Sequence, residues 1–297
     1  MAIHWHVLGA GAMGCLFASA LHRAGRAITL VLRDGGETGY ATLRVEREDA
    51  TEEVRVPVSA GGDKGPISHL LVTTKAYDVH PAVTSVAHRL DGHSQVLLLV
   101  NGMGFAEELQ RDFAWLVPYH GTTTEGAYRL APAHIRHAGR GQTRLGRPGQ
   151  DDPPGWFEHW SAALDSCVWD RDIAQAQWLK LAINCAINPL TALHDCRNGE
   201  LAQRPELARE VARLCREIAE ISAAAGYPRI AERVQSAVDE VIAGTADNRS
   251  SMLQDILQGR RTEIDYITGH LLAVARQHGI AAPCNTALLE DVRKLDR

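Results

Sequence analysis

A polar stripe runs through an otherwise apolar segment at residues 178–191. Lys180, Asn184 and Asn188 recur every four residues, so on a helix their side chains lie on one face. Most neighbouring residues are apolar, which is typical of a buried helix. Because a buried ammonium and two buried amides are costly without partners, the stripe favours a bound ligand. The alternative is a lysine that reaches solvent beside two asparagines that bridge helices.

A small 2-keto acid suits this stripe, because its carboxylate and carbonyl oxygens accept hydrogen bonds. Burial would lower the pKa of the lysine toward the range in which it can donate a proton to a forming alkoxide. We therefore predict that Lys180 is a general acid in the reduction of a 2-keto acid. Further along, Ser250 or Ser251 could cap a helix and leave hydroxyls for a carboxylate. Glu263 could accept from a substrate hydroxyl or a ribose, or serve only the helix start.

Residues 9–14, Gly-Ala-Gly-Ala-Met-Gly, follow an apolar run and open a helical one. Gly9 permits a tight turn, Gly11 lets the backbone approach a pyrophosphate, and Gly14 allows the helix to lie close to the strand. Main-chain amides at the helix start would then meet the negative charge. In this context the motif predicts a dinucleotide site, and the alternative is a glycine-rich turn without a ligand.

The next strand ends at Arg33-Asp34, where such proteins recognise the ribose of the cofactor. Arginine would clasp the extra phosphate of NADP and stack on adenine, whereas aspartate would accept from the ribose hydroxyl of NAD. The order of the two residues favours NADP, unless Arg33 is only a surface charge. Lys75 and Asn101 follow two later strands, and ligands gather at the carboxyl ends of such strands. Lys75 could instead be loop surface and Asn101 a turn former.

Two kinds of hydrophobic periodicity indicate the strands and helices that would position these residues. Short apolar runs alternate with helical stretches in the first part, and residues 43–46 and 54–57 indicate a hairpin at a sheet edge, where Pro57 would fit. Beyond Asp170 the period is helical. The expected fold is α/β, a Rossmann-type doubly wound sheet followed by an all-α C-terminal domain, with an NADP-binding domain at 1–170 and a helical catalytic domain at 171–297. The expected strands are residues 3–8, 28–32, 69–73 and 96–100, and the expected helices are residues 174–193, 205–225, 230–242, 251–257 and 263–278.

Composition narrows the possible partners. The 297 residues carry a formal net charge of −5 and no long basic run, so we expect no nucleic-acid partner. The six cysteines are dispersed without a Cys-x-x-Cys pair, and we expect no metal site. No signal peptide and no apolar run of about 20 residues is evident. We therefore expect a cytoplasmic protein that does not enter membranes, as a monomer or a homodimer.

Several longer motifs resemble those of the ketopantoate reductase family over nearly the whole chain. Besides the glycine turn they include Thr-Lys-Ala, Asn-Gly-Met-Gly and Gly-Thr-Thr-Thr in the first part, and long matches in the helical part. In this numbering they are residues 74–76, 101–104, 121–124, 180–192, 198–201, 250–255 and 262–266.

The resemblance implies that the chain reduces 2-dehydropantoate to pantoate with NADPH, a step toward pantothenate and coenzyme A. It makes Lys180 the catalytic proton donor and Glu263 its acidic partner. The residues implied for the substrate are Asn101, Lys180, Asn184, Asn188, Asn198 and Ser251. Those implied for the cofactor are Gly9, Ala10, Gly11, Ala12, Met13, Gly14, Arg33, Lys75, Asn101, Ala127 and Glu263. Two alternatives are a reductase of another branched 2-keto acid and a nucleotide-binding sensor without activity.

Overall fold

The computed structural model describes residues 3–33 and 39–296, which form two compact units. The first unit holds Met1–Val100 and Phe105–Ile173, and the second holds Asn101–Gly104 and Ala174–Arg297. The short segment Asn101–Gly104 therefore packs with residues far along the chain. Within the described ranges, none of the helices is long and apolar enough to cross a membrane.

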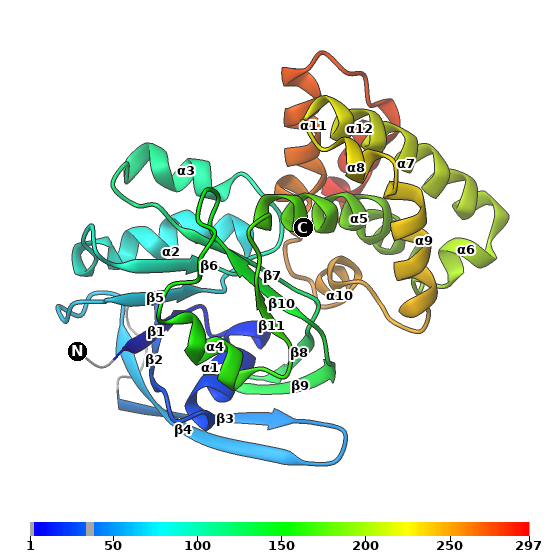
Figure 1. Cartoon of the computed structure of the whole chain (residues 1–297). Coiled ribbons are helices and arrows are strands. Elements are labelled where there is room, and N and C mark those ends of the chain that lie inside the picture. The colour runs from blue at the N-terminus through cyan, green and yellow to red at the C-terminus, as the bar shows by residue number, and fades with distance from the viewer. Residues whose placement is uncertain (1–2, 34–38, 297) are drawn as a thin grey trace. The chain divides into compact units, whose positions relative to one another are not determined.

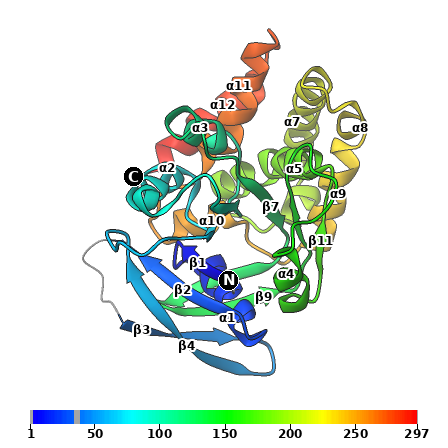
Figure 2. The same cartoon turned by 60° about the vertical axis from the view of Figure 1, so that its left-hand side comes forward.

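The centre of the first unit is a parallel sheet of apolar strands. Its hydrogen-bonded strands lie in the order β7, β6, β5, β1, β2. Most of their residues are buried, as expected where helices cover both faces of a sheet. Helices α2 and α3 lie on one face, and α1 and α4 lie on the other (Figures 1 and 2). All four expected strands are confirmed. The bounds are β1 (His4–Leu8), α1 (Ala12–Arg23), β2 (Ala27–Leu32), β5 (His69–Val72), α2 (Val79–Val86), β6 (Gln95–Leu98), α3 (Phe105–Asp112), β7 (Tyr119–Thr123) and α4 (Phe157–Ala163).

The expected hairpin is formed by β3 (Gly39–Glu46) and β4 (Thr51–Ala60), which pair antiparallel along their length. Its expected place at a sheet edge was wrong. Strand β4 also pairs with β2 and β3 pairs with β9 (His134–Gly139), so the hairpin lies inside the sheet. The pairing of β4 with β2 begins at Val58, directly after Pro57. Strands β8 (Gly126–Ala131) and β11 (Cys167–Trp169) are the ends of the described sheet, and β10 (Thr143–Gly146) joins β11 to β7.

Tryptophans hold α4 against the sheet of the first unit. The ring centroid of Trp5, on β1, lies 5.3 Å from that of Trp156 and 5.6 Å from that of Trp160. All three side chains are buried, and their edge-to-face contacts add to the burial of a large apolar area. On another side, the ring of Trp5 meets the imidazole of His69, on β5, at 5.2 Å. This cluster lies at the strand starts, so it supports the fold and leaves the opposite ends for ligands.

The second unit is helical, and its core forms around α5. Buried residues of α5 such as Cys185 and Leu190 share one apolar cluster with Leu214 of α7 and Leu271 of α11. The expected helices at residues 174–193, 205–225 and 251–257 are confirmed at α5, α7 and α10. The stretch expected as one helix at 230–242 divides into α8 and α9, and that at 263–278 divides into a 3₁₀ turn (Ile264–Tyr266) and α11. Helix α12 was missed, because Pro283 resembles a stop signal yet lies in the first turn of a helix, where its missing N–H costs nothing. The bounds are α5 (Ile173–His194), α6 (Glu200–Gln203), α7 (Pro205–Ala224), α8 (Pro228–Ala231), α9 (Val234–Gly244), α10 (Ser251–Leu257), α11 (Thr268–Gln277) and α12 (Pro283–Leu295).

Candidate active site

The glycine turn joins β1 to α1 and is too tight for side chains at two positions. Gly9 has a φ of +109°, and a Cβ there would lie 2.7 Å from the main-chain nitrogen of Thr74. A Cβ at Gly14 would lie 1.9 Å from the carbonyl oxygen of Gly9. These two glycines are therefore required by the protein itself, whether or not a ligand binds.

Gly11 differs from the other two glycines. Its φ of −79° suits any residue, and a Cβ there would meet no described atom within 4 Å. The open space beside Gly11 borders the first turn of α1, which carries no acidic residue. A helix start with exposed amides and room for close approach matches the needs of a pyrophosphate. The turn therefore fits a dinucleotide cofactor.

Arg33 follows the end of β2, in the region where a dinucleotide presents its ribose. Its guanidinium Nη2 donates to Oδ2 of Asp78 at 2.8 Å, and the arginine side chain is 87% exposed. An exposed ion pair of this kind is weak, so a phosphate could take the place of the carboxylate. Asp34, the competing ribose acceptor of the sequence analysis, lies outside the described residues.

The other cofactor candidates of the first unit are Lys75 and Ala127. Lys75 comes three residues after β5 ends, at the carboxyl end of a central strand. Its neighbour Thr74 has a buried hydroxyl with no hydrogen-bond partner among the described residues, which the sequence did not single out. Ala127 lies on β8, a strand that contacts α1. Ala127 was proposed from the family resemblance alone, and it packs against the apolar core that includes residues of α1.

Lys180 and Glu263 interact within the second unit. Lys180 is half-buried on α5, whereas Glu263, between α10 and α11, is buried with 5% of its surface exposed. Burial lowers the pKa of Lys180 to about 8, and the negative charge of Glu263 partly opposes this shift. An amine with a pKa near 8 exchanges protons readily near neutral pH. The lowered pKa that the sequence analysis expected is thus present.

The asparagine stripe continues along α5 from Lys180. Asn184 is half-buried and Asn188 is buried, and the flanking Leu181, Cys185 and Ile187 belong to the apolar core. The helix continues through Pro189, although proline has no N–H to donate to the helical hydrogen bonds. The stripe therefore presents one ammonium and two amides from a helix that its apolar neighbours hold in place.

Ser250, and not Ser251, caps α10. Its Oγ accepts from the main-chain N–H of Leu253 at 3.1 Å, so Ser251 keeps its hydroxyl at the exposed helix start. The buried hydroxyl of Thr191, three residues beyond Asn188 on α5, lies 2.7 Å from the Ser250 hydroxyl. Thr191 was not singled out from the sequence, although its position extends the stripe by one helical turn.

Asn198 is buried in the loop after α5, and Asn101 belongs to the second unit as well. The Asn101–Gly104 segment is anchored by the main-chain N–H of Met103, which donates to the carbonyl oxygen of Tyr266 at 2.9 Å. Tyr266 comes three residues after Glu263. The residues proposed for the substrate therefore belong to one unit, together with Glu263: Asn101, Lys180, Asn184, Asn188, Asn198 and Ser251. The glycine turn, Arg33, Lys75 and Ala127, which are proposed for the cofactor, belong to the other unit.

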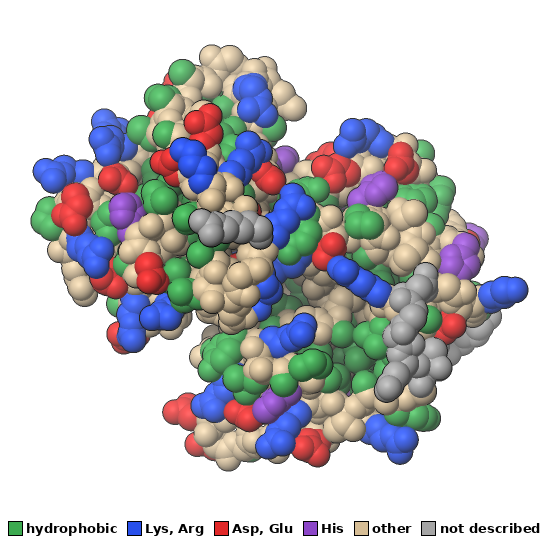
Figure 3. All heavy atoms as spheres, turned by 180° about the vertical axis from the view of Figure 1, so that it is seen from behind, with side chains coloured by type: hydrophobic (Ala, Val, Ile, Leu, Met, Phe, Trp, Pro, Cys, Tyr) green, Lys and Arg blue, Asp and Glu red, His purple; other side chains and the backbone are tan. Residues whose placement is uncertain are grey.

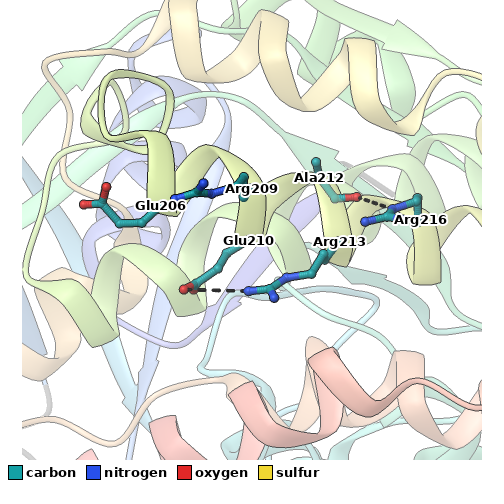
Figure 4. A pocket seen from close by; sticks show the side chains of 6 residues that line it. All are labelled: Glu206, Arg209, Glu210, Ala212, Arg213 and Arg216. Atoms are coloured by element: carbon teal, nitrogen blue, oxygen red, sulfur yellow. Dashed lines mark hydrogen bonds and ion pairs between the residues drawn. The ribbon is translucent and has the colours of Figure 1, made fainter.

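A surface hollow of about 470 Å³ lies elsewhere, along α7 (Figure 4). Its lining includes Arg209 and Arg216, and Arg213 pairs with Glu210 at 4.0 Å. Basic and acidic side chains are also intermixed on the face of the molecule that Figure 3 shows. The hollow contains none of the candidate site residues, and we assign it no ligand.

The comparisons with known proteins bear on this arrangement. A family model described as "Ketopantoate reductase PanE/ApbA" matches residues 5–150, and its C-terminal counterpart matches residues 172–296. The 2-dehydropantoate 2-reductase of Yersinia pestis is 39% identical over 293 residues, covering 97% of this chain and 93% of the relative. The chain belongs to the ketopantoate reductase family. This confirms the family resemblance seen in the sequence motifs.

Solved structures agree with the family assignment. The PanE/ApbA family ketopantoate reductase from Ralstonia eutropha JMP134 superposes with a TM-score of 0.88 at 26% identity, covering 99% of this chain and 98% of that one. A D-mandelate dehydrogenase solved with NADH and anilino(oxo)acetate has the same TM-score at 23% identity, with the same coverage. At that identity the second likeness concerns the fold alone. The expected Rossmann-type unit followed by a helical one is thus confirmed for this ketopantoate reductase family member.

Proposed function

We propose that this chain is an NADPH-dependent 2-dehydropantoate 2-reductase, which forms pantoate for the synthesis of pantothenate and coenzyme A. The observation that carries the proposal is Lys180, whose pKa burial lowers to about 8 on a helix that also presents Asn184 and Asn188. Membership of the family supports the substrate. A sensor without activity is disfavoured, because it would not need a lysine of lowered pKa that interacts with a buried Glu263.

NADPH held by the first unit would supply the hydride for the C2 carbonyl of the keto acid. The carbonyl π electrons move onto oxygen as the new C–H bond forms, and the Nζ of Lys180 donates a proton to that oxygen. The neutral amine regains a proton from water, which is rapid for a group with a pKa near 8. Glu263 stabilises the protonated lysine between cycles, as the direction of its charge effect on the Lys180 pKa indicates.

The amides of the stripe would orient the substrate. Each asparagine side chain offers two N–H donors, and a keto acid presents a carboxylate and a carbonyl that accept them. Asn184, Asn188 and Ser251 would bind these oxygens, and Asn101 would reach both substrate and cofactor. Holding the substrate in one orientation supplies much of the rate enhancement in such reactions.

The first unit would hold NADPH. The main-chain amides at the start of α1 would bind its pyrophosphate beside Gly11, and Arg33 would bind the ribose phosphate, with Lys75 and Ala127 alongside. The domain limits at 170 and 171 and the cytoplasmic location are part of the proposal. A monomer and a homodimer are both compatible with it.

Oxidation of NADPH by the purified chain tests the proposal. With 2-dehydropantoate as substrate, absorbance of the reduced nicotinamide should fall, and pantoate should accumulate in equal amount. A panel of branched 2-keto acids and a parallel assay with NADH separate this reductase from relatives of other specificity. Turnover of another keto acid with none of 2-dehydropantoate would overturn the assignment of substrate.

A further inference from the structure

The side-chain amide of Asn198 has a defined orientation. Its Nδ2 lies 2.8 Å from the hydroxyl oxygen of Thr245, at the end of α9. That hydroxyl lies 2.6 Å from the carbonyl oxygen of Val241, to which it donates. Since a hydroxyl has one proton, Thr245 must accept from Asn198, and the amide NH₂ group must face it.

The opposite side of the amide is its oxygen. Oδ1 of Asn198 is buried and has no hydrogen-bond partner among the described residues. A buried acceptor without a donor is costly, so this oxygen is placed to accept from a donor group of a bound ligand. The backbone keeps it in place, because the N–H groups of Asn198 and Gly199 donate to the carbonyl oxygens of Asn248 and Ala246, both at 3.0 Å.

The donor follows from the chemistry of the proposed substrate, so this inference rests on the proposed function. The carboxylate and the C2 carbonyl of 2-dehydropantoate are acceptors only. Its terminal hydroxyl is the single donor that the molecule carries. An amide that presents oxygen rather than NH₂ therefore matches the hydroxyl end of the substrate and not its carboxylate.

We propose that Thr245 is a positioning residue for substrate specificity: it holds the amide of Asn198 with its oxygen toward the substrate hydroxyl, and so favours hydroxylated 2-keto acids. Without the Thr245 hydroxyl, the amide can rotate and present NH₂, which cannot accept from the substrate. The resemblance of the chain to its family assigns no role to Thr245.

The test compares two substrates that differ by one oxygen atom. They are 2-dehydropantoate and 3,3-dimethyl-2-oxobutanoate, in which a methyl group replaces the hydroxymethyl. For Thr245→Val, kcat/KM with 2-dehydropantoate should fall on the order of tenfold, the worth of one hydrogen bond, while kcat/KM with the dimethyl compound stays within about twofold. Thr245→Ser retains a hydroxyl and should keep the ratio of the unaltered enzyme.

Three other results are possible. If Thr245→Val loses kcat/KM equally with both substrates, so that the ratio of the two kcat/KM values is unchanged, the proposal is wrong. If Thr245→Val does not fold, Thr245→Ala removes the same hydroxyl from this half-buried position and is judged by the same ratio. If the unaltered enzyme reduces neither compound, the proposed function itself is wrong and this inference falls with it. Measurement of the NADPH dissociation constant, which should not change, separates a substrate effect from damage to the first unit.

Discussion

The hydroxyl oxygens of Thr191 and Ser250 lie 2.7 Å apart and join the end of the asparagine stripe to the start of α10. Both residues are buried, and Ser250 also caps α10 through the N–H of Leu253. One hydrogen bond thus links the helix that carries Lys180 to the helix start that carries Ser251.

Replacement of Thr191 by valine should weaken both stability and substrate binding. Loss of the buried hydroxyl removes a partner of Ser250, and the free energy of unfolding should fall by about 1–2 kcal/mol. KM for the keto acid should rise because Ser251 is held less firmly, while NADPH affinity stays the same. Urea denaturation and steady-state kinetics measure the two effects. Thr191→Ser is the matched control, and an unaltered KM in Thr191→Val would remove the link to Ser251.

The lowered pKa of Lys180 predicts how the reaction depends on pH. Lysine acts as an acid only when protonated, so kcat/KM should be constant at low pH and decline as pH rises through about 8. Lys180→Ala should lower kcat by about 10²–10⁴, the usual worth of a general acid. Lys180→Arg keeps the positive charge but holds its proton too firmly, so it should be nearly as slow. A decline that persists unchanged in Lys180→Arg would assign the titration to another group.

The glycine turn offers a pair of substitutions with opposite effects. Gly14→Ala places a Cβ against the carbonyl oxygen of Gly9 and should destabilise the first unit by several kcal/mol, on the order of an overpacked core. Gly11→Ala meets open space, so thermal stability should change little, while NADPH binds at least about tenfold more weakly because the methyl group lies where the pyrophosphate approaches. Thermal denaturation and cofactor titration separate the two. Undiminished NADPH affinity in Gly11→Ala would argue against a pyrophosphate at this position.

The pair of Arg33 and Asp78 predicts the preference for cofactor. Arg33→Ala should weaken NADPH binding by about 10- to 100-fold and leave NADH unaffected, because only NADPH carries the phosphate. Asp78→Asn removes the carboxylate that holds Arg33 at 2.8 Å, and NADPH should then bind up to about fivefold more tightly. Nicotinamide fluorescence titrations of the unaltered protein and of both variants give these dissociation constants. Equal losses for NADPH and NADH in Arg33→Ala would mean that the arginine does not recognise the phosphate.

Two histidines of the first unit predict a loss of stability in acid. Burial, followed by the charges of His4 and Arg89, lowers the pKa of His6 to about 4, and burial with the charge of His159 lowers that of His69 to about 4. The unfolded chain has a histidine pKa near 6.5. Between about pH 6.5 and 4 the unfolded state therefore binds more protons, so the free energy of unfolding should fall as pH falls through this range.

Chemical denaturation across that range measures the slope, and a substitution identifies its source. His69→Gln, which cannot titrate, should make the slope shallower than in the unaltered protein. His278 is an exposed histidine with which to make the same change as a control, and His278→Gln should leave the slope as it was. Identical slopes in the His69→Gln and unaltered proteins would exclude His69 as a source.

Much of the fold could be predicted from local sequence patterns, because apolar runs and helical periodicity reflect which residues are buried. The four central strands and the helices α5, α7 and α10 were predicted for that reason, and the spacing of Lys180, Asn184 and Asn188 indicated the stripe. The hairpin of β3 and β4 was misplaced at an edge, since its pairing with β9 joins segments far apart in the chain. No local pattern records such a partner.

Two residues of the proposed site were missed for a similar reason. Thr191 and Thr245 hydrogen-bond to Ser250 and Asn198, which lie near in space but distant in sequence. A single threonine in a helix or at its end gives no periodic signal. The turn glycines, by contrast, were identified because the tight turn itself demands them at fixed spacing.

Because Asn101–Gly104 is anchored by Tyr266, the second unit depends on two separate parts of the chain. This matters when the protein is synthesised and when it is divided into fragments. During synthesis this segment leaves the ribosome well before its partner, so it must wait until the late helices emerge. A fragment that starts at Ala174 would likewise lack the loop against which Tyr266 packs. The helical unit is thus encoded in two separate pieces, and a gene split before Ala174 would deliver this unit incomplete.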